Sequence, residues 1–485
     1  MLISQTFALN KSQYELDFVD IDPSGDMPLF LDPYFLSYRK DPWSAKATQT
    51  FRSFFQEFIR LVREGREGDA RNLLNYLGEP NETCLGLSKD SPRGNAIGDV
   101  FEDKLHDSLL QSEAIKTGLV EDLEDTRVFI KGIDRDRLSD ITTNIIRKHL
   151  IEYTQAQCQL WGIPLRQAPS SYYWNGVQRR WENDYEDMLV VNDQRLLLVP
   201  KAVVGYAQKY AAQQYRQHYV LNFLKADHLH RNTSLVQTKI RKDGSVRRFV
   251  TKKSIIEAFE DDGVVLDKEW LANFTESHPE VFWDFKQKTI DKIEVIKSEE
   301  LTEIALSDVA DHLITTLQNI EPGTSNATKY HRLATGILEL IFYPHLVYPQ
   351  VEREIHQGRK RIDIIYENAA TEGFFFRLYN THQIPSGNIY VECKNYSTDV
   401  SNPELDQLSG RFSVNRGKAG LLLSRSVEDM ELLKNRCADT YSDDRGLIIP
   451  LVDSDLIELL GFVAQYDYPS VDRFLVQRMR DIKMR

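Results

Sequence analysis

Two carboxylates and a lysine stand at the ends of two predicted strands in the last third of the chain. Asp363 lies in the apolar segment 361–365, RIDII, and Glu392 and Lys394 end the segment 389–394, IYVECK. Residues rich in Ile, Val and Tyr favour strands. Glu392 and Lys394 are two positions apart, so they point to the same face of a strand, and pairing of the two strands would bring Asp363 beside them.

These three residue types predict metal-dependent hydrolysis. Two carboxylates within ligand distance repel each other unless a divalent cation neutralises them. Mg²⁺ prefers carboxylate, carbonyl and water oxygens, and a water bound to it can attack a phosphodiester. Lys394 supplies a positive charge that can lower the pKa of that water or stabilise the pentacovalent phosphate.

The arrangement Asp363…Glu392-Cys393-Lys394 resembles the D…(D/E)xK signature of the PD-(D/E)xK superfamily of restriction-endonuclease-like nucleases, especially its Mrr-like branch. The resemblance covers residues 328–460, roughly a quarter of the chain. It implies a nuclease that binds Mg²⁺ or Mn²⁺ through Asp363, Glu392 and the backbone carbonyl of Cys393. Lys394 would then be the catalytic lysine.

Further positions match residues that this superfamily carries. Glu339 stands on a predicted helix before the first strand, where the family often adds an acidic metal ligand, and Gln407 stands on the helix after Lys394, where Mrr-like members carry a glutamine. Ile362 replaces the proline that often precedes the aspartate, a common departure. Phosphate contacts are assigned to the basic residues near the motif: Arg359, Lys360, Arg361, Arg411, Arg416 and Lys418. For Arg411 and Arg416 a solvated helix face is the alternative.

The predicted elements around the motif follow the αβββαβ order of the superfamily core. In chain order they are a helix at 328–343, strands near 351–355, 361–366 and 389–393, a helix at 403–415, a strand at 419–424, a helix at 427–440, a strand at 447–452 and a helix at 454–464. We therefore expect an α+β or α/β nuclease domain with a mixed central sheet over residues 327–485. The alternative is an ordinary ion pair at a sheet edge in a non-catalytic α/β domain.

Residues 1–320 are expected to form a large, mostly helical region with β-hairpins, with a sub-boundary near 165–190. The segment 321–326, EPGTSN, reads as the linker to the nuclease domain. The expected elements are a hairpin within 7–18, two helices over 45–76, a long helix reaching about Cys158, a hairpin over 189–199, a helix over 206–225, a basic hairpin over 239–253 and a helix over 298–318. This region would serve recognition, assembly or regulation.

The segment 239–253 is strongly basic around Asp243-Gly244, a pair typical of tight hairpin turns. Such a hairpin could follow a phosphate backbone. Charges on a solvated edge hairpin also block aggregation between strands. Both interpretations stay open from the sequence.

Charge is unevenly distributed along the chain. The net charge of −13 argues at first against a nucleic-acid partner, because phosphate binding needs clustered Lys and Arg. Residues 328–425 nevertheless hold 12 Lys and Arg against 10 Asp and Glu. Local charge decides contact, so the predicted nuclease core remains compatible with nucleic acid.

Composition also bears on location. No apolar run approaches the length of a membrane span, and residues 1–5 lack the basic and apolar pattern of a signal peptide. We expect a cytoplasmic protein with no membrane partner. The cysteines form no CxxC pair, which argues against a disulfide framework and a zinc site: Cys84, Cys158, Cys393 and Cys437.

The sequence therefore predicts an Mg²⁺- or Mn²⁺-dependent endonuclease that hydrolyses phosphodiester bonds, with double-stranded DNA as the expected substrate. Family analogy suggests a restriction or anti-phage defence effector, acting as a homo-oligomer or with a partner defence protein. One alternative is a non-catalytic module that binds nucleic acid or protein on a nuclease scaffold. Another is a regulated effector that cleaves RNA.

Overall fold

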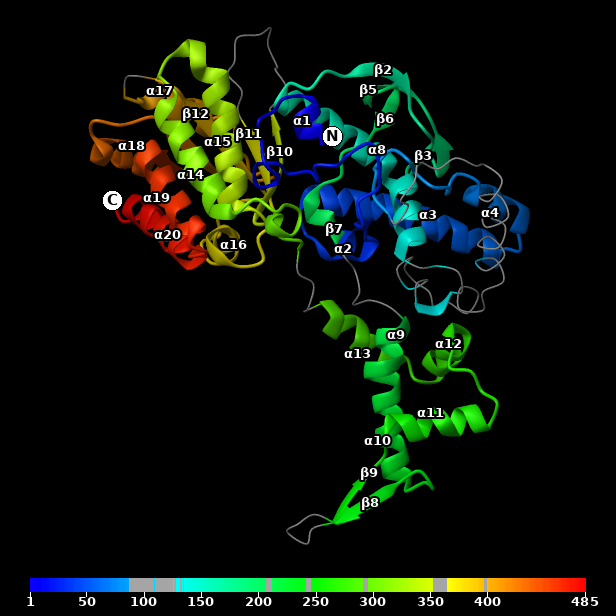
Figure 1. Cartoon of the computed structure of the whole chain (residues 1–485). Coiled ribbons are helices and arrows are strands. Elements are labelled where there is room, and N and C mark those ends of the chain that lie inside the picture. Colours follow the sequence, from blue (N-terminus) through cyan, green and yellow to red (C-terminus); the bar gives the residue numbers. More distant parts are fainter. Residues whose placement is uncertain are drawn as a thin grey trace.

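The structure, a computed structural model, describes residues 1–86, 109, 125, 128–130, 133, 135–205, 212–240, 246–290, 295–351, 364–396 and 399–485. Figure 1 shows a C-terminal part built around a sheet, an N-terminal part beside it, and an arm that projects away from both. Within the described residues, none of the helices combines the length and the apolar character that crossing a bilayer requires.

The C-terminal part is α+β and is built on a five-stranded mixed sheet with neighbouring strands in chain order. Its strands are β10 (Leu346–Val351), β11 (Ile364–Asn368), β12 (Asn388–Lys394), β13 (Ala419–Ser424) and β14 (Leu447–Val452). β10, β11 and β12 pair antiparallel, whereas β12, β13 and β14 pair in parallel. Every residue of β13 and β14 is buried, as parallel strands between helical layers require.

Helices enclose this sheet. α17 (Asn402–Ser409) and α18 (Met430–Ser442) connect the parallel strands, whereas α14 (Leu306–Asn319), α15 (Ala327–Phe342) and α19 (Asp453–Ala464) pack against one another. α16 (Gly373–Asn380) and α20 (Tyr468–Lys483) complete the part. The apolar side chains of these helices and of the strands form one continuous core.

The N-terminal part packs around α8 (Arg135–Trp161), against which α3 (Pro42–Arg63) lies. Asp41 caps α3 by accepting a hydrogen bond from the Ser44 amide at 2.9 Å. The i, i+3, i+4, i+7 spacing of its phenylalanines puts them on one buried face. The other elements are α1 (Ile3–Thr6), η1 (Gln13–Glu15), β1 (Phe30–Leu31), α2 (Pro33–Tyr38), α4 (Glu67–Leu74), β2 (Arg166–Pro169), β3 (Tyr173–Asn175), β4 (Arg180–Glu182), β5 (Tyr185–Val191), β6 (Gln194–Leu196), η2 (Lys201–Val203) and β7 (Val204–Gly205).

The arm begins with a continuous helical stretch. Its elements are α9 (Ala212–Tyr215), the π-helical turn η3 (Arg216–Val220), α10 (Leu221–Arg231), β8 (Gln237–Ile240), β9 (Val246–Phe249), α11 (Lys252–Asp261), α12 (Lys268–Ser277) and α13 (Pro279–Ile290). A small core of its own forms beside the hairpin from Leu221, Val250, Ile255 and Leu266. Figure 1 shows the β8–β9 hairpin at the far end of the arm.

Most predicted elements of the C-terminal part are confirmed. The helix at 328–343 is α15, the strands at 419–424 and 447–452 are β13 and β14, and the strand at 389–393 lies within β12. The long N-terminal helix, the hairpin of β5 and β6 and the basic hairpin of β8 and β9 are present as expected. The Asp243-Gly244 turn and residues 206–211 lie outside the described residues.

Four predicted elements are wrong or displaced. The helix expected over 403–415 ends at Ser409, with Gly410 at its C-terminus. Residues 7–18 form no hairpin and contain only the short 3₁₀ turn η1, because the Gln13 side chain bonds the Phe18 carbonyl and the Asp20 amide at 2.8 Å each and replaces a strand ladder. The first strand of the sheet begins at Leu346, not near 351. The helix expected over 298–318 begins only at Leu306, since Ser298–Glu300 forms a separate turn, η4.

The early start of β10 depends on a bulge. The register between β10 and β11 shifts between Val347 and Gln350, and Tyr348 has a positive φ of 52°. A bulge leaves a residue out of the ladder, so Pro349, which has no N–H to donate, can lie within the strand.

Candidate functional site

Glu392 and Lys394 lie together on the central strand β12. The register pairs Glu392 with Leu422 and Lys394 with Ser424, so both residues are on one face, as their spacing predicts. Their side chains are 0% and 1% exposed and form an ion pair between Lys394 Nζ and Glu392 Oε1. Removing two charged side chains from water costs free energy unless they form an ion pair with each other. This contact therefore holds both side chains in place.

Two residues from α17 and the turn after it complete this group. Arg411 Nη1 donates to Glu392 Oε2 at 3.0 Å, and Lys394 Nζ donates to Gln407 Oε1 at 3.4 Å. On the same face the ring of Tyr390 contacts that of Phe412, with centroids 5.7 Å apart. The structure thus brings together Glu392, Lys394, Gln407 and Arg411, whose catalytic and phosphate-binding roles stay predictions.

Glu339 belongs to the helix on the opposite face of the sheet. Tyr366 faces α15, because its hydroxyl donates to the Thr335 carbonyl at 3.4 Å, and it pairs with Ile389. Alternation along β12 then turns Ile389, Val391 and Cys393 toward α15 and turns Glu392 away from it. No contact in the described part of the chain joins Glu339 to Glu392.

The partner of Glu339 comes from the N-terminal part. Its carboxylate lies 3.8 Å from Lys201 Nζ, and both side chains are fully buried. Burial raises the pKa of Glu339, and the nearby Asp17 raises it further, whereas burial lowers the pKa of Lys201. The metal-ligand role of Glu339 stays a prediction, and the observed packing gives it a structural role.

The Cys393 carbonyl is engaged from the α15 side. His331 Nε2 lies 3.0 Å from this oxygen, and only the imidazole can be the donor. A carbonyl has two lone pairs, so one remains for another ligand. Burial raises the pKa of the Cys393 thiol, which favours the carbonyl over a thiolate as the metal-binding group. Sequence reasoning missed His331, although His331, Thr335 and Glu339 recur every four residues along one helix face.

Of the other predicted residues, some lie outside the described part of the chain and the described ones do not join this group. Arg359, Lys360, Arg361 and Asp363 lie outside the described residues. Arg416 precedes β13, and its carbonyl accepts a hydrogen bond from the Asn388 amide. Asn388 is four residues before Glu392 on β12, a distance of about 13 Å along the strand. Lys418 is held by the carbonyl and carboxylate of Asp444 at 2.8 and 3.0 Å. Nucleic-acid contact by Arg416 and Lys418 stays a prediction.

The oxygen atoms around Glu392 are of the type that binds a hard divalent cation. A carboxylate and a backbone carbonyl are oxygen ligands of the type that Mg²⁺ and Mn²⁺ take. In the described residues, the buried Ser424 hydroxyl, paired with Lys394 in register, has no hydrogen-bond partner. Described His, Cys, Asp and Glu side chains nowhere gather in threes around a metal position. The described part therefore supplies some of the ligands that such an ion needs, and Asp363 would have to supply another.

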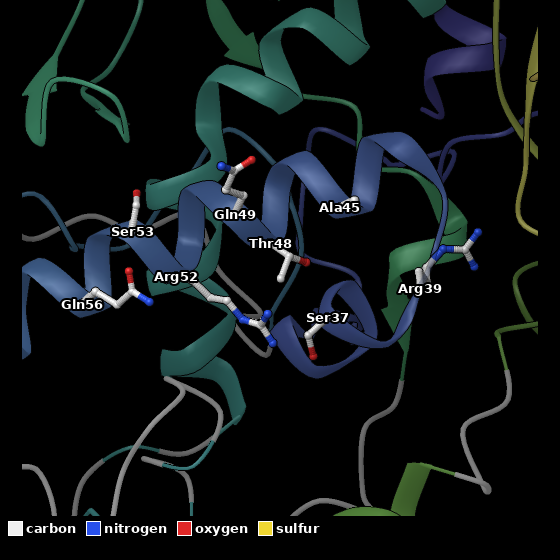
Figure 2. Close-up of a pocket in the computed structure, with 8 residues that line it drawn as sticks. All are labelled: Ser37, Arg39, Ala45, Thr48, Gln49, Arg52, Ser53 and Gln56. Carbon is white, nitrogen blue, oxygen red and sulfur yellow. The ribbon is translucent and has the colours of Figure 1, made fainter. Parts of the chain in front are cut away.

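A pocket on the N-terminal part is not related to this site. It has a volume of about 420 Å³ and lies along α2 and α3. Figure 2 shows Thr48 and Arg52 extending from α3 toward the side of Ser37, whereas Gln49 and Ser53 extend the other way. These side chains do not converge on one point, and none of the residues that line the pocket is acidic.

Comparisons with known proteins bear on the N-terminal part alone. A family model for a domain of unknown function (DUF8370) matches residues 8–211. No curated protein and no solved structure matches the chain. The matched range contains Asp17 and Lys201 and ends before the described arm and the Glu392 group.

Proposed function

We propose that this protein is a metal-dependent endonuclease that hydrolyses phosphodiester bonds in double-stranded DNA. The convergence of Glu392, Lys394, Gln407 and Arg411 on one face of a mixed sheet is the observation that supports the proposal best. Burying a carboxylate together with two cations costs free energy of folding. Apolar side chains of similar size would stabilise the fold as well, so folding alone does not explain these charges. A role in restriction or anti-phage defence is proposed from the resemblance to restriction-endonuclease-like proteins.

Each residue of the group has a chemical task in this proposal. Lys394 and Arg411 both contact the Glu392 carboxylate and put positive charge where a phosphorane would develop negative charge. Gln407 accepts from Lys394 and so orients its ammonium group. Bound Mg²⁺ or Mn²⁺, held by Glu392, the Cys393 carbonyl and Asp363, would supply an activated water and neutralise the phosphate.

The test is cleavage by the full-length protein. Purified protein is incubated with supercoiled DNA, linear DNA and RNA, with Mg²⁺, with Mn²⁺ or with a chelator. We expect DNA cleavage that the chelator abolishes. Glu392→Gln, Lys394→Met and Asp363→Asn should each lower the rate on the order of 10³-fold, because each removes electrostatic stabilisation of the transition state.

Matched controls separate chemistry from folding. Glu458→Gln and Lys329→Met change exposed residues of α19 and α15 and should leave the rate within about twofold. Melting temperatures of all variants show whether the fold persists. Undiminished cleavage by Glu392→Gln or Lys394→Met, or cleavage of RNA alone, would contradict the proposal.

A further inference from the structure

The far end of the arm is the most basic segment of an acidic chain. Residues 221–253 hold nine Lys and Arg against two Asp and Glu, in a protein of net charge −13. Seven of the nine lie in the described residues, on α10, on both strands of the hairpin and at the start of α11: Lys225, Arg231, Lys239, Arg247, Arg248, Lys252 and Lys253. Such clustering is the electrostatic footprint of a phosphate-binding surface.

The backbone register of the hairpin puts basic residue types at directly opposite positions. The register places Lys239 opposite Arg247 and puts Arg248 next along the same strand. Like charges at directly opposite positions of an antiparallel pair repel each other. A few lysines would suffice to prevent edge aggregation. A bound anion would neutralise the basic residues that the register puts opposite each other. This arrangement therefore favours binding of an anionic ligand over a role in preventing aggregation.

The arm is anchored so that the hairpin is held at a distance from the rest of the molecule. The stretch from Ala212 to Arg231 is helical throughout, about 30 Å at 1.5 Å per residue. Its root is fixed by Tyr215, which is fully buried against Phe282 and Phe285 and whose hydroxyl lies 2.8 Å from Thr275 Oγ1. This length is close to one turn of a DNA duplex.

Local contacts fix the hairpin to this rod. Arg248 hydrogen-bonds the side chain of Asn232, the residue that ends α10 in a left-handed conformation. Thr251 caps α11 by accepting from the Ser254 amide at 3.0 Å, and Lys252 bonds the Gln217 carbonyl. These contacts hold the two strands to α10 and α11, and Figure 1 shows the hairpin at the far end of the arm.

We infer that the β8–β9 hairpin is a second DNA-binding site that holds the phosphate backbone of a duplex away from the Glu392 group. A two-stranded ribbon fits the major groove of B-form DNA, whereas the major groove of A-form RNA is too narrow for side chains to read. The inference rests on the proposed function only in taking DNA as the ligand. Binding at the arm needs none of the residues of the Glu392 group.

The test measures binding without cleavage. A labelled duplex of about 30 base pairs, three helical turns, is titrated with full-length protein in the presence of a chelator, at salt concentrations between about 50 and 200 mM. The variant Lys239→Glu/Arg247→Glu/Arg248→Glu should bind at least about tenfold more weakly at the middle of this range. The slope of log affinity against log salt should fall by about 2.7, at roughly 0.9 for each lost phosphate contact.

A control with the same change in net charge is available. Arg63→Glu/Arg473→Glu/Arg480→Glu alters three exposed arginines of α3 and α20 and should bind within about twofold of the wild type. The neutral variant Lys239→Gln/Arg247→Gln/Arg248→Gln should fall between wild type and the charge reversal. The neutral variant shows whether weaker binding comes from the lost positive charges or from unfolding of the hairpin by three added acidic residues.

The outcomes separate this inference from the nuclease proposal. Full-length protein that binds the duplex, loses affinity in the arm variant and yet never cleaves with Mg²⁺ or Mn²⁺ would sink the nuclease proposal and leave the arm site standing. Wild-type affinity in the arm variant, equal weakening in the control, or binding of RNA duplex alone would overturn the arm site.

Discussion

At the scale of single residues, the fully buried set of Asp17, Lys201 and Glu339 joins the two main parts of the chain. Tyr153 donates to Asp17 at 2.7 Å, and Lys201 Nζ lies over the Tyr343 ring at 4.1 Å. Burial raises the pKa of both carboxyls and lowers the pKa of Lys201. One ammonium cannot neutralise two carboxylates, so the set is best accommodated with a proton on one of them.

Removing Lys201 should therefore destabilise the protein strongly. In Lys201→Met, Asp17 and Glu339 stay buried without their ammonium partner, which costs about 3–5 kcal/mol of unfolding free energy. Lys201→Met/Glu339→Gln should recover part of this loss, because one carboxylate is gone. The measurement is the denaturation midpoint by circular dichroism.

A second ion pair provides the comparison for that loss. Lys288 and Asp284 approach to 2.8 Å, closer than Lys201 and Glu339, yet their side chains are 62% and 47% exposed. Lys288→Met should leave the denaturation midpoint close to that of the wild type, because water screens this pair. Equal losses in Lys201→Met and Lys288→Met would show that burial does not govern the effect.

Single residues also show what the sequence could and could not predict. Glu392 and Lys394 lie on one face of β12 as expected because their relation depends only on strand periodicity, whereas Gln407 was assigned by family resemblance and Arg411 as a phosphate contact, and those roles stay predictions. The pairing of Glu339 with Lys201 joins residues from two separate parts of the chain, and no local pattern encodes it. Helical periodicity could have identified His331, because it shares a helix face with Glu339.

At the scale of elements, burial decided which predictions succeeded. β13 and β14 were placed at their observed bounds because both are continuous apolar runs. α16 and α20 were not expected. α16 lies within what looked like an insertion, and α20 mixes charged residues with the buried Val471, Leu475, Met479 and Ile482. Its apolar stripe has helical spacing, but it lies beyond the part of the chain that resembles a known family.

The helix α14 defines where the C-terminal part begins. It precedes the 321–326 linker, yet its buried residues belong to the C-terminal core: Leu306, Val309, Leu313 and Leu317. The linker also packs onto the end of β12, since the Gly323 amide donates to the Asn395 carbonyl at 2.8 Å and the Asn395 side chain donates to the Gly323 carbonyl at 2.7 Å. A boundary at 327 would therefore cut through one packed unit.

This packing predicts the behaviour of two fragments. A fragment of residues 302–485 should melt cooperatively, whereas 327–485 should melt at a lower temperature or be insoluble, because it exposes the surface that α14 covers. Each buried leucine left without α14 costs about 1.5–3 kcal/mol. Thermal melts followed by circular dichroism compare the fragments, and identical melts would place α14 outside the folded unit.

At the scale of the whole molecule, the N-terminal and C-terminal parts share hydrogen bonds at several points. The Gln157 side chain donates to the Pro349 carbonyl at 2.9 Å, and the Ser44 and Tyr348 hydroxyls lie 3.1 Å apart. Val347 and Tyr348 of β10 even belong to the N-terminal core. These contacts connect the N-terminal part directly to the sheet that carries Glu392, and the regulatory role of residues 1–320 stays a prediction.

Glu367 makes one of these links sensitive to pH. It lies on β11, is 9% exposed, and its Oε2 accepts a hydrogen bond from the Trp43 amide at 2.7 Å. Burial raises the pKa of this carboxyl from 4.5 to about 7. Between these values the folded protein keeps a proton that the unfolded chain loses, so stability falls as pH rises through this window and levels off above about pH 7.

Replacing this carboxyl by an amide should remove that dependence. Glu367→Gln still accepts from the Trp43 amide but cannot ionise, so its melting temperature should match that of the wild type near the low end of the window. At about pH 8 it should exceed the wild type by the equivalent of up to about 3 kcal/mol, because a pKa shift of one unit corresponds to about 1.4 kcal/mol. The exposed substitution Glu458→Gln should show no such trend. A Glu367→Gln protein that is less stable than the wild type at about pH 8 would mean that the ionised carboxylate strengthens the contact between the two parts.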